Sequence, residues 1–231
     1  MKLHHLCGIV TLGLLTGCAA TTAVPQGGNG TVQRDPVCSP VTADQELLLN
    51  LAQEMVTEGR PHAALANLEQ LPVTIPEVRL RMARILRTLD AQRAQVLYRG
   101  LLNESCFEAA AHHGLGQIAA TQNDYREASG HLRMASRLAP ADQDIRNDLG
   151  VVYLHLRRLN EARFELLTAL ELAEDDTRAV ENLLTLLLYQ DDMQQASVLI
   201  ERKALSPQQY EAAQLRASRL HQEDQASGGV R

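Results

Sequence analysis

A spacing of 34 residues runs through the middle of the chain and limits the folds that it can adopt. Leu115 and Gly116 recur 34 residues later as Leu149 and Gly150. The other pairs at this separation are Ala128 and Ala162, Ala135 and Ala169, and Asp142 and Asp176. A constant period of this length is typical of repeat proteins, in which each unit buries its apolar side against its neighbours. We therefore expect a stack of similar units.

The residues that recur indicate what each unit contains. Gly116, Ala128 and Ala135 are small, as is required where two helices cross closely. Pro140 lacks the backbone N–H that a continuing helix needs, so it closes the unit. The pattern and its spacing resemble the tetratricopeptide repeat, whose unit is a pair of antiparallel helices, A and B. The resemblance places Leu115 and Gly116 in helix A.

The repeat extends in both directions from its best copy, which spans 109–142. The other expected units are 45–74, 75–108, 143–176 and 177–210. The last of these departs from the pattern, because Leu184 stands where the small residue belongs. After it, Ser206 and Pro207 are suited to the N-cap and first position of a final helix that ends at about His221.

These observations predict an all-α fold, a tetratricopeptide-repeat superhelical solenoid of about five helix pairs with a C-terminal capping helix. The composition agrees, because only 3% of the residues are aromatic and the apolar residues are mainly Leu and Ala, which favour helices. We expect Leu51 to pack in the first unit, and Leu132 and Leu138 to fill the space between helices in the best copy.

The first residues resemble a bacterial lipoprotein signal peptide. The apolar run 6–15 is too short to cross a bilayer stably, but it suits a secretory signal. It leads into Leu15-Thr16-Gly17-Cys18, which resembles the lipobox, so we expect a diacylglyceryl group on Cys18. The alternative is an ordinary signal peptide with a chance cysteine. Because Ala19 and not Asp follows Cys18, the resemblance implies sorting to the outer membrane, with the protein on its periplasmic face.

The predicted organisation has four parts. They are a signal peptide at 1–17, a lipidated cysteine with a flexible tether at 18–43, the solenoid at 44–223 and a disordered tail at 224–231. The tether is rich in Gly, Thr, Pro and Asn and cannot bury apolar surface. Of the two cysteines that remain, Cys38 lies in the tether and Cys106 at the end of the second unit. An exported protein meets an oxidising compartment, so we expect a disulfide between them, with two free thiols as the alternative.

Helix A residues that do not pack inward are expected to line a groove for a protein partner. By their position in the repeat, these are His113, Gln117, Asn147, Val151, Leu154, His155, Glu181, Leu188 and Tyr189. Such a groove suits an extended peptide or a helix of the partner. The alternative for each residue alone is an ordinary solvated surface position.

The sequence offers no site for catalysis, a metal or a cofactor. His112 and His113 are neighbours that a helix points about 100° apart, so they do not converge on one ion. The G-x-G-x-x-A motif at 114–119 lies inside a helix, whereas a dinucleotide-binding motif must follow a strand. We therefore expect neither an enzyme nor a small-molecule substrate. With 22 basic and 28 acidic residues, the chain also lacks the basic excess that nucleic-acid binding needs.

Three features together resemble the TadD family, the tetratricopeptide lipoproteins of the tight-adherence (Flp/Tad) pilus system. They are the lipobox before a small solenoid, the stretch Asn147–Tyr153, and the ending from Ala196 through Glu201–Gln209. The resemblance implies a pilotin-like assembly factor that binds an outer-membrane secretin through the repeat groove. Two alternatives remain open: a lipoprotein adaptor for peptidoglycan enzymes or other envelope complexes, and a pilotin of type IV pili.

Overall fold

Aspartate residues begin many of the helices, and they recur at the period of the repeat. The side chain of Asp142 accepts a hydrogen bond from the backbone N–H of Ile145, and that of Asp176 accepts one from Arg178. The other aspartate N-caps are Asp90, Asp124 and Asp192. An N-cap pairs a backbone N–H that the helix itself leaves unpaired, so these side chains fix where the helices begin.

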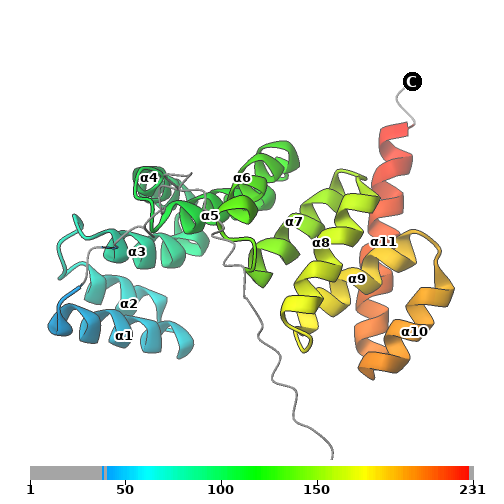
Figure 1. Ribbon diagram of the computed structural model, residues 1–231, viewed down its shortest axis with the longest axis horizontal. Helices are drawn as coiled ribbons and strands as arrows, with labels where there is room; N and C mark the ends of the chain where they lie inside the picture. Colours follow the sequence, from blue (N-terminus) through cyan, green and yellow to red (C-terminus); the bar gives the residue numbers. More distant parts are fainter. Residues whose placement is uncertain (1–37, 39–40, 229–231) are drawn as a thin grey trace, which may run out of the picture. The chain divides into compact units, whose positions relative to one another are not determined.

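The computed structural model describes Cys38 and residues 41–228, and within them it contains eleven α-helices and no strand (Figure 1). The helices are α1 (Ala43–Thr57), α2 (Pro61–Leu68), α3 (Pro76–Leu89), α4 (Ala91–Leu101), α5 (Glu108–Thr121), α6 (Tyr125–Leu138), α7 (Gln143–His155), α8 (Leu159–Leu172), α9 (Thr177–Tyr189), α10 (Met193–Lys203) and α11 (Pro207–Gly228). Consecutive helices pair as A and B, from α1 with α2 to α9 with α10, and α11 follows alone. The structure thus confirms the predicted fold class.

Four of the five turns between helices A and B in the described chain reuse one backbone conformation. Gly59, Asn123, Arg157 and Asp191 occupy the same place in their units, and all have a positive φ, between 56° and 74°. Gly, Asn and Asp adopt this left-handed conformation at low cost, but Arg does not. Arg157 is therefore the exception among the four, and its side chain explains why it is tolerated.

Glycine lets the two helices of a unit come into close contact. A Cβ added at Gly116 would lie 2.7 Å from Leu132 Cγ, and one at Gly150 would lie 2.7 Å from Leu166 Cγ and 3.2 Å from its backbone nitrogen. Because Leu132 and Leu166 are fully buried, neither has room to move away. The small residues at these positions are thus explained by the helix crossing, as predicted.

The last unit shows what happens without this glycine. Leu184 is fully buried at the equivalent position, and α10 buries only Ala196. In α8 the matching positions, Ala162, Leu166 and Ala169, are all buried, whereas Ile200 and Lys203 of α10 are only partly buried. The large side chain at 184 therefore goes with a B helix that packs less deeply.

Two of the leucines expected in the core lie at the surface. Leu51 is 38% exposed, because it belongs to the first described helix and no earlier described helix covers it. Leu138 is 44% exposed at the last position of α6, and Leu172 is 40% exposed at the same position of α8. The prediction was wrong for both residues, and for Leu138 the reason is that the end of helix B in these units faces solvent.

Cys38 and Cys106 form a disulfide, with their Cα atoms 5.7 Å apart. The bond joins the segment before α1 to the turn between α4 and α5, across 68 residues of sequence. In the chain-entropy account, closing a loop of this length stabilises the folded state by about 4 kcal/mol. The first two units are thereby linked covalently.

The C-terminal boundary differs from the prediction. Helix α11 continues to Gly228, whereas the chain from 224 onward was expected to be a disordered tail. Asp224 accounts for the difference, because it accepts hydrogen bonds from Arg157 and Tyr189 and so holds this part of the helix in place.

The predicted signal peptide at 1–17, Cys18 and most of the tether lie outside the described residues. Among the helices that are described, none has both the length and the apolar character to span a membrane.

Two histidines face each other between α5 and α6. His112 Nδ1 and His131 Nδ1 are 2.9 Å apart, so one donates a hydrogen bond and the other accepts it. Burial lowers the pKa of both rings. The charge of His131 lowers the pKa of His112 further, whereas Glu108 raises it. For His131, Glu127 raises the pKa and the charge of Arg99 lowers it. The folded chain thus favours the neutral rings.

We predict that exchanging Gly150 for alanine destabilises the chain by about 1–3 kcal/mol, because the added Cβ overlaps Leu166. The matched control is Gly130→Ala at an exposed position of α6, where a Cβ meets no atom within 4 Å. That control should stabilise the helix by roughly 0.5–1 kcal/mol. Chemical denaturation measures both changes, and equal effects of the two substitutions would contradict the packing account.

From the histidine pair we predict that the stability of the folded chain falls as the pH drops below 6.5, the ordinary pKa of histidine. The folded pKa values lie below the unfolded ones, so in this range the unfolded chain binds more protons and gains free energy relative to the folded chain. Urea unfolding between pH 7.5 and 5 should show this decline, and His131→Asn should reduce its slope. His62→Asn, on the exposed surface of α2, should leave the slope unchanged. If the two variants behave alike, the pair is not the cause.

Candidate functional site

The A helices line one side of the chain, which we call the inner face. Its middle row consists of Gln53, Arg84, Gln117, Val151 and Thr185, one from each A helix, and all five line cavities. Two neighbouring cavities occupy the part formed by α1, α3, α5 and α7, and a smaller one lies beside α11. The inner face therefore has an open section and a section covered by the chain itself.

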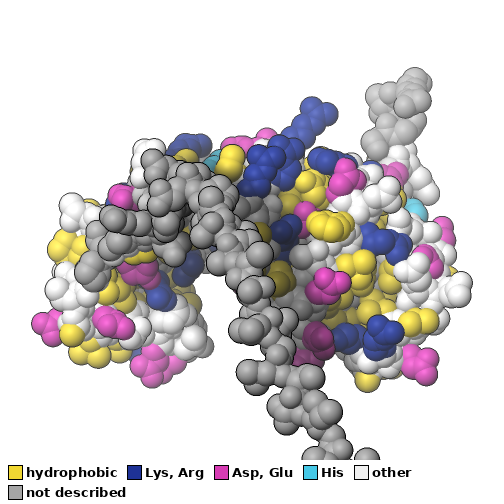
Figure 2. Space-filling view, in the orientation of Figure 1, with side chains coloured by type: hydrophobic (Ala, Val, Ile, Leu, Met, Phe, Trp, Pro, Cys, Tyr) yellow, Lys and Arg dark blue, Asp and Glu magenta, His cyan; other side chains and the backbone are white. Residues whose placement is uncertain are grey.

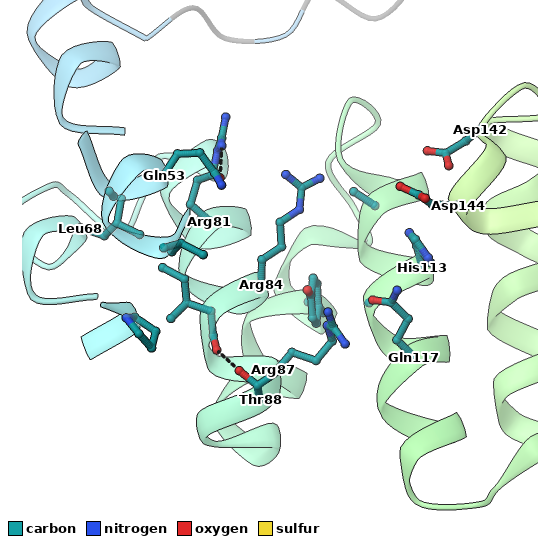
Figure 3. A pocket seen from close by; sticks show the side chains of 17 residues that line it. Gln53, Leu68, Arg81, Arg84, Arg87, Thr88, His113, Gln117, Asp142 and Asp144 are labelled. Carbon is teal, nitrogen blue, oxygen red and sulfur yellow. Dashed lines mark hydrogen bonds between the residues drawn. The ribbon is translucent and has the colours of Figure 1, made fainter. Parts of the chain in front are cut away.

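The larger cavity of the open section, which we call the α3–α5 cavity, has a volume of about 570 Å³. Figure 3 shows Arg81, Arg84 and Arg87 of α3 on one side of it and His113 and Gln117 of α5 on the other. Tyr98 forms part of its floor, with its ring packed against the backbone of Gly114. Because a side chain at 114 would occupy the place of this ring, glycine is needed there.

His113 and Gln117 do not simply face solvent. His113 Nε2 lies 2.8 Å from Asp148 Oδ2, and Gln117 Nε2 donates to the same oxygen at 2.7 Å. Burial opposes ionisation of Asp148, but hydrogen bonds from His113, Gln117 and Asn147 outweigh it and hold the pKa of Asp148 below its ordinary value. Both predicted groove residues line the cavity, and they also bind α5 to α7.

The next predicted residue, Asn147, continues this network to α9. Its Oδ1 accepts a hydrogen bond from Asn182 Nδ2 at 2.8 Å, and only 4% of the residue is exposed. Asn147 therefore joins neighbouring A helices. It also borders a second cavity of about 330 Å³, which shares Arg87 and Gln117 with the α3–α5 cavity and has Val151 in its wall. The two cavities thus adjoin along the inner face.

Helix α11 lies over the inner face of the last unit. Arg216 of α11 donates to Thr185 Oγ1 at 3.1 Å and to Glu181 Oε2 at 3.3 Å. Leu188 is buried in the same core cluster as Leu220 of α11. These contacts explain why Glu181, Leu188 and Tyr189, which were expected to line an open groove, are covered in this structure.

The C-terminal half of α11 is held by Arg157. Its Nε donates to Asp224 Oδ1 at 2.7 Å and its Nη2 to the Leu220 carbonyl at 3.0 Å. Tyr189 donates to the other carboxylate oxygen of Asp224 at 2.6 Å and stacks on His221. The strained left-handed backbone of Arg157 is offset by these contacts, because a charged hydrogen bond contributes about 1.5–3 kcal/mol.

Two further predicted residues lie between the open and the covered sections. Leu154 is buried in the core, 4% exposed, so it contributes packing rather than binding. The ring of His155 stacks on Tyr125 at a centroid distance of 4.2 Å, and burial lowers its pKa. With Val151, these residues border the cavity of about 140 Å³ beside α11. The structure therefore brings the predicted residues onto one face, but leaves only His113, Gln117, Asn147 and Val151 of them beside the open section.

The arginines of α3 were missed by sequence reasoning. Arg81, Arg84 and Arg87 are spaced three apart, so they fall on one side of a helix whose other side carries the buried Ala83 and Leu86. That spacing was the available signal. It was hidden because the second unit matches the repeat loosely and the chain as a whole is acidic.

Apolar side chains also reach the surface on the B helices. Figure 2 shows hydrophobic side chains among the charged ones over α8 and α10, where Phe164, Leu167 and Val198 are at least 44% exposed. Within the part of the chain that the structure describes, no group of three or more His, Cys, Asp or Glu is arranged to hold a metal ion. The described surface offers hydrogen bonds, ion pairs and apolar contact, which are the means of binding another protein.

Replacing Arg157 with asparagine should loosen α11 without disturbing the turn, because asparagine accepts the left-handed backbone. We expect hydrogen–deuterium exchange at 213–228 to become about tenfold faster, equal to about 1.4 kcal/mol, while α1 to α6 keep their protection. Asp191→Asn is the matched control, since Asp191 has the same backbone conformation and is exposed. Unchanged exchange in the Arg157 variant would show that α11 is held by other contacts.

Comparison with known proteins places this geometry in a family. Residues 119–187 match the family described as tetratricopeptide repeat. The chain is 43% identical over 205 residues to the TPR repeat-containing protein PA4299 of Pseudomonas aeruginosa. The aligned region covers 88% of this chain and 80% of that protein.

Solved structures with lower identity share the fold. Pseudomonas aeruginosa PilF is 17% identical with a TM-score of 0.62, over 80% of this chain and 87% of the other. TTC0263, a thermophilic TPR protein of Thermus thermophilus, is 19% identical with a TM-score of 0.60, and the match covers 76% of this chain and 98% of the other. MamA of Desulfovibrio magneticus is 22% identical with a TM-score of 0.57, and the match covers 76% of this chain and 99% of the other. The chain belongs to the tetratricopeptide repeat protein family.

Proposed function

We propose that this chain is an outer-membrane lipoprotein of Flp/Tad pilus assembly that binds the secretin of the system, in the manner of a pilotin. The chain would serve as a scaffold without catalysis of its own. The lipid on Cys18 would hold it to the periplasmic face of the outer membrane, and the inner face would bind a segment of the secretin.

The open section of the inner face carries this proposal. Two adjoining cavities run along α3, α5 and α7, and their walls combine guanidinium, amide and imidazole groups with the aliphatic side chains of Val151 and Val152. A small-molecule site is usually one concave, mostly apolar pocket, whereas this is an extended and partly polar track. A segment of another protein, with several side chains in sequence, fits such a track better.

The disulfide between Cys38 and Cys106 supports a place in the cell envelope. Disulfides form and persist mainly in oxidising compartments such as the bacterial periplasm. The lipobox resemblance at Leu15–Cys18 supports a membrane anchor, because a diacylglyceryl group adds about 0.8 kcal/mol for each buried CH₂. The link to Flp pili rests on the resemblance of Asn147–Tyr153 and of Ala196 through Glu201–Gln209 to the TadD family.

The test is crosslinking in living cells, followed by purification of the lipidated protein and mass spectrometry of its partners. We expect the Flp secretin as the main crosslinked protein. Peptidoglycan enzymes without secretin would contradict the pilus role and favour an envelope adaptor. Recovery of a type IV pilus secretin instead would assign the protein to that system.

A Cys18→Ala variant provides the matched control for the anchor. It should appear in the soluble periplasmic fraction, while the unchanged protein appears in the outer-membrane fraction. If the variant still fractionates with the outer membrane, lipid on Cys18 is not what holds the protein there.

A further inference from the structure

The guanidinium groups in the α3–α5 cavity differ in what they bind. Arg81 is engaged, since its Nε donates to Glu77 at 2.7 Å and its Nη1 to Gln53 at 3.0 Å. Arg84 is exposed and has no hydrogen bond or ion pair to any described residue. The Nε of Arg87 is buried without an acceptor in the described part of the chain. The rest of the Arg87 guanidinium interacts with the Tyr98 hydroxyl, so Arg84 is the cavity arginine that no hydrogen bond or ion pair with a described residue engages.

The carboxylates around the cavity do not neutralise these arginines. Asp142 accepts the N-cap hydrogen bond of α7, and Asp144 forms an ion pair with Arg178. Asp148 is held by His113 and Gln117. Arg84 is exposed on the cavity wall, so a carboxylate from outside can reach its guanidinium and form a charge-assisted hydrogen bond there.

Guanidinium groups favour carboxylates, because their planar fork matches the two oxygens of the acid. The α3–α5 cavity continues into the second cavity, which is bordered by Arg87 and Gln117 and then by Leu132, Val151 and Val152. A free anion would use only the arginine end of this track. A peptide segment with an acidic residue followed by aliphatic residues would use both ends.

The covered section of the inner face shows that such binding works in this fold. There, Asp224 of α11 pairs with Arg157, while Ala213, Ala217 and Leu220 of α11 pack into the core. A segment with carboxylates on arginine and aliphatic side chains on the helices is thus already accommodated over the last unit. The open section presents the same two kinds of contact without an occupant from the described chain.

We propose that the α3–α5 cavity binds an acidic–aliphatic segment of the protein partner, with carboxylates on Arg84 and Arg87. This inference rests on the proposed protein-binding role and adds the chemistry by which the partner is recognised.

The experiment selects binders for the full-length chain from a random peptide library displayed on phage. We expect the enriched peptides to carry Asp or Glu close to aliphatic residues. The best peptide, labelled and measured by fluorescence anisotropy, should lose about tenfold in affinity with Arg84→Gln and less with Arg84→Lys, which keeps the charge. Arg126→Gln, on the exposed surface of α6, is the matched control and should change nothing. Enrichment without acidic residues, no enrichment, or equal effects at Arg84 and Arg126 would overturn the proposal.

The same variants in the cell separate this inference from the proposed function. Loss of the secretin crosslink with Arg84→Gln, but not with Arg126→Gln, supports both. A secretin crosslink that is equally strong in both variants would overturn the arginine site and leave the pilus role standing. Acid-dependent peptide binding without any secretin crosslink would support the site and contradict the pilus role.

Discussion

The close contact between the two helices of a unit is the constraint on which the other features depend. Gly116 and Gly150 let the leucines of helix B lie against the backbone of helix A. One side of helix A is therefore buried against helix B, and the other side lines the inner face. Leu184 breaks this rule in the last unit, where α10 buries only Ala196. Helix α9 packs instead against α11, which contributes Ala213, Ala217 and Leu220 to the same hydrophobic core. The substitution at one position thus goes together with the extra helix on the inner face.

The repeat could be predicted from the sequence because its determinants are local and recur. An aspartate N-cap and a left-handed turn each act within a few residues, a small residue acts on the paired helix of its own unit, and all three recur at a spacing of 34 residues. The place of α11 could not be predicted in this way. Its docking depends on Arg157 and Asp224, which are 67 residues apart in sequence, and Arg157 stands at a turn position where only backbone conformation is usually selected.

The candidate site shows a similar limit. Position in the repeat indicated which residues face the inner side, and most of the predicted residues do lie along it, whereas Leu154 is buried in the core. It did not indicate that Asn147 pairs with Asn182, or that His113 and Gln117 share Asp148. Polar residues on neighbouring A helices meet one another because the helices stack side by side, so a repeat position that faces inward is as able to join units as to bind a partner. The arginines of α3 differ, since neither Arg84 nor the Nε of Arg87 has an acceptor among the residues that the structure describes.

Helix α11 limits how much of the inner face a partner can use. Its polar contacts involve Arg157 and Arg216, but its alanines and Leu220 are part of the main core of the C-terminal units. Releasing α11 would expose this apolar surface to water at a cost of about 25 cal/mol for each Å². We therefore regard α11 as a fixed part of the fold, not as a lid. In the proposed binding mode, an incoming segment would be confined to the track from α1 to α7, and its affinity would depend on the two arginines and on the aliphatic wall beyond them.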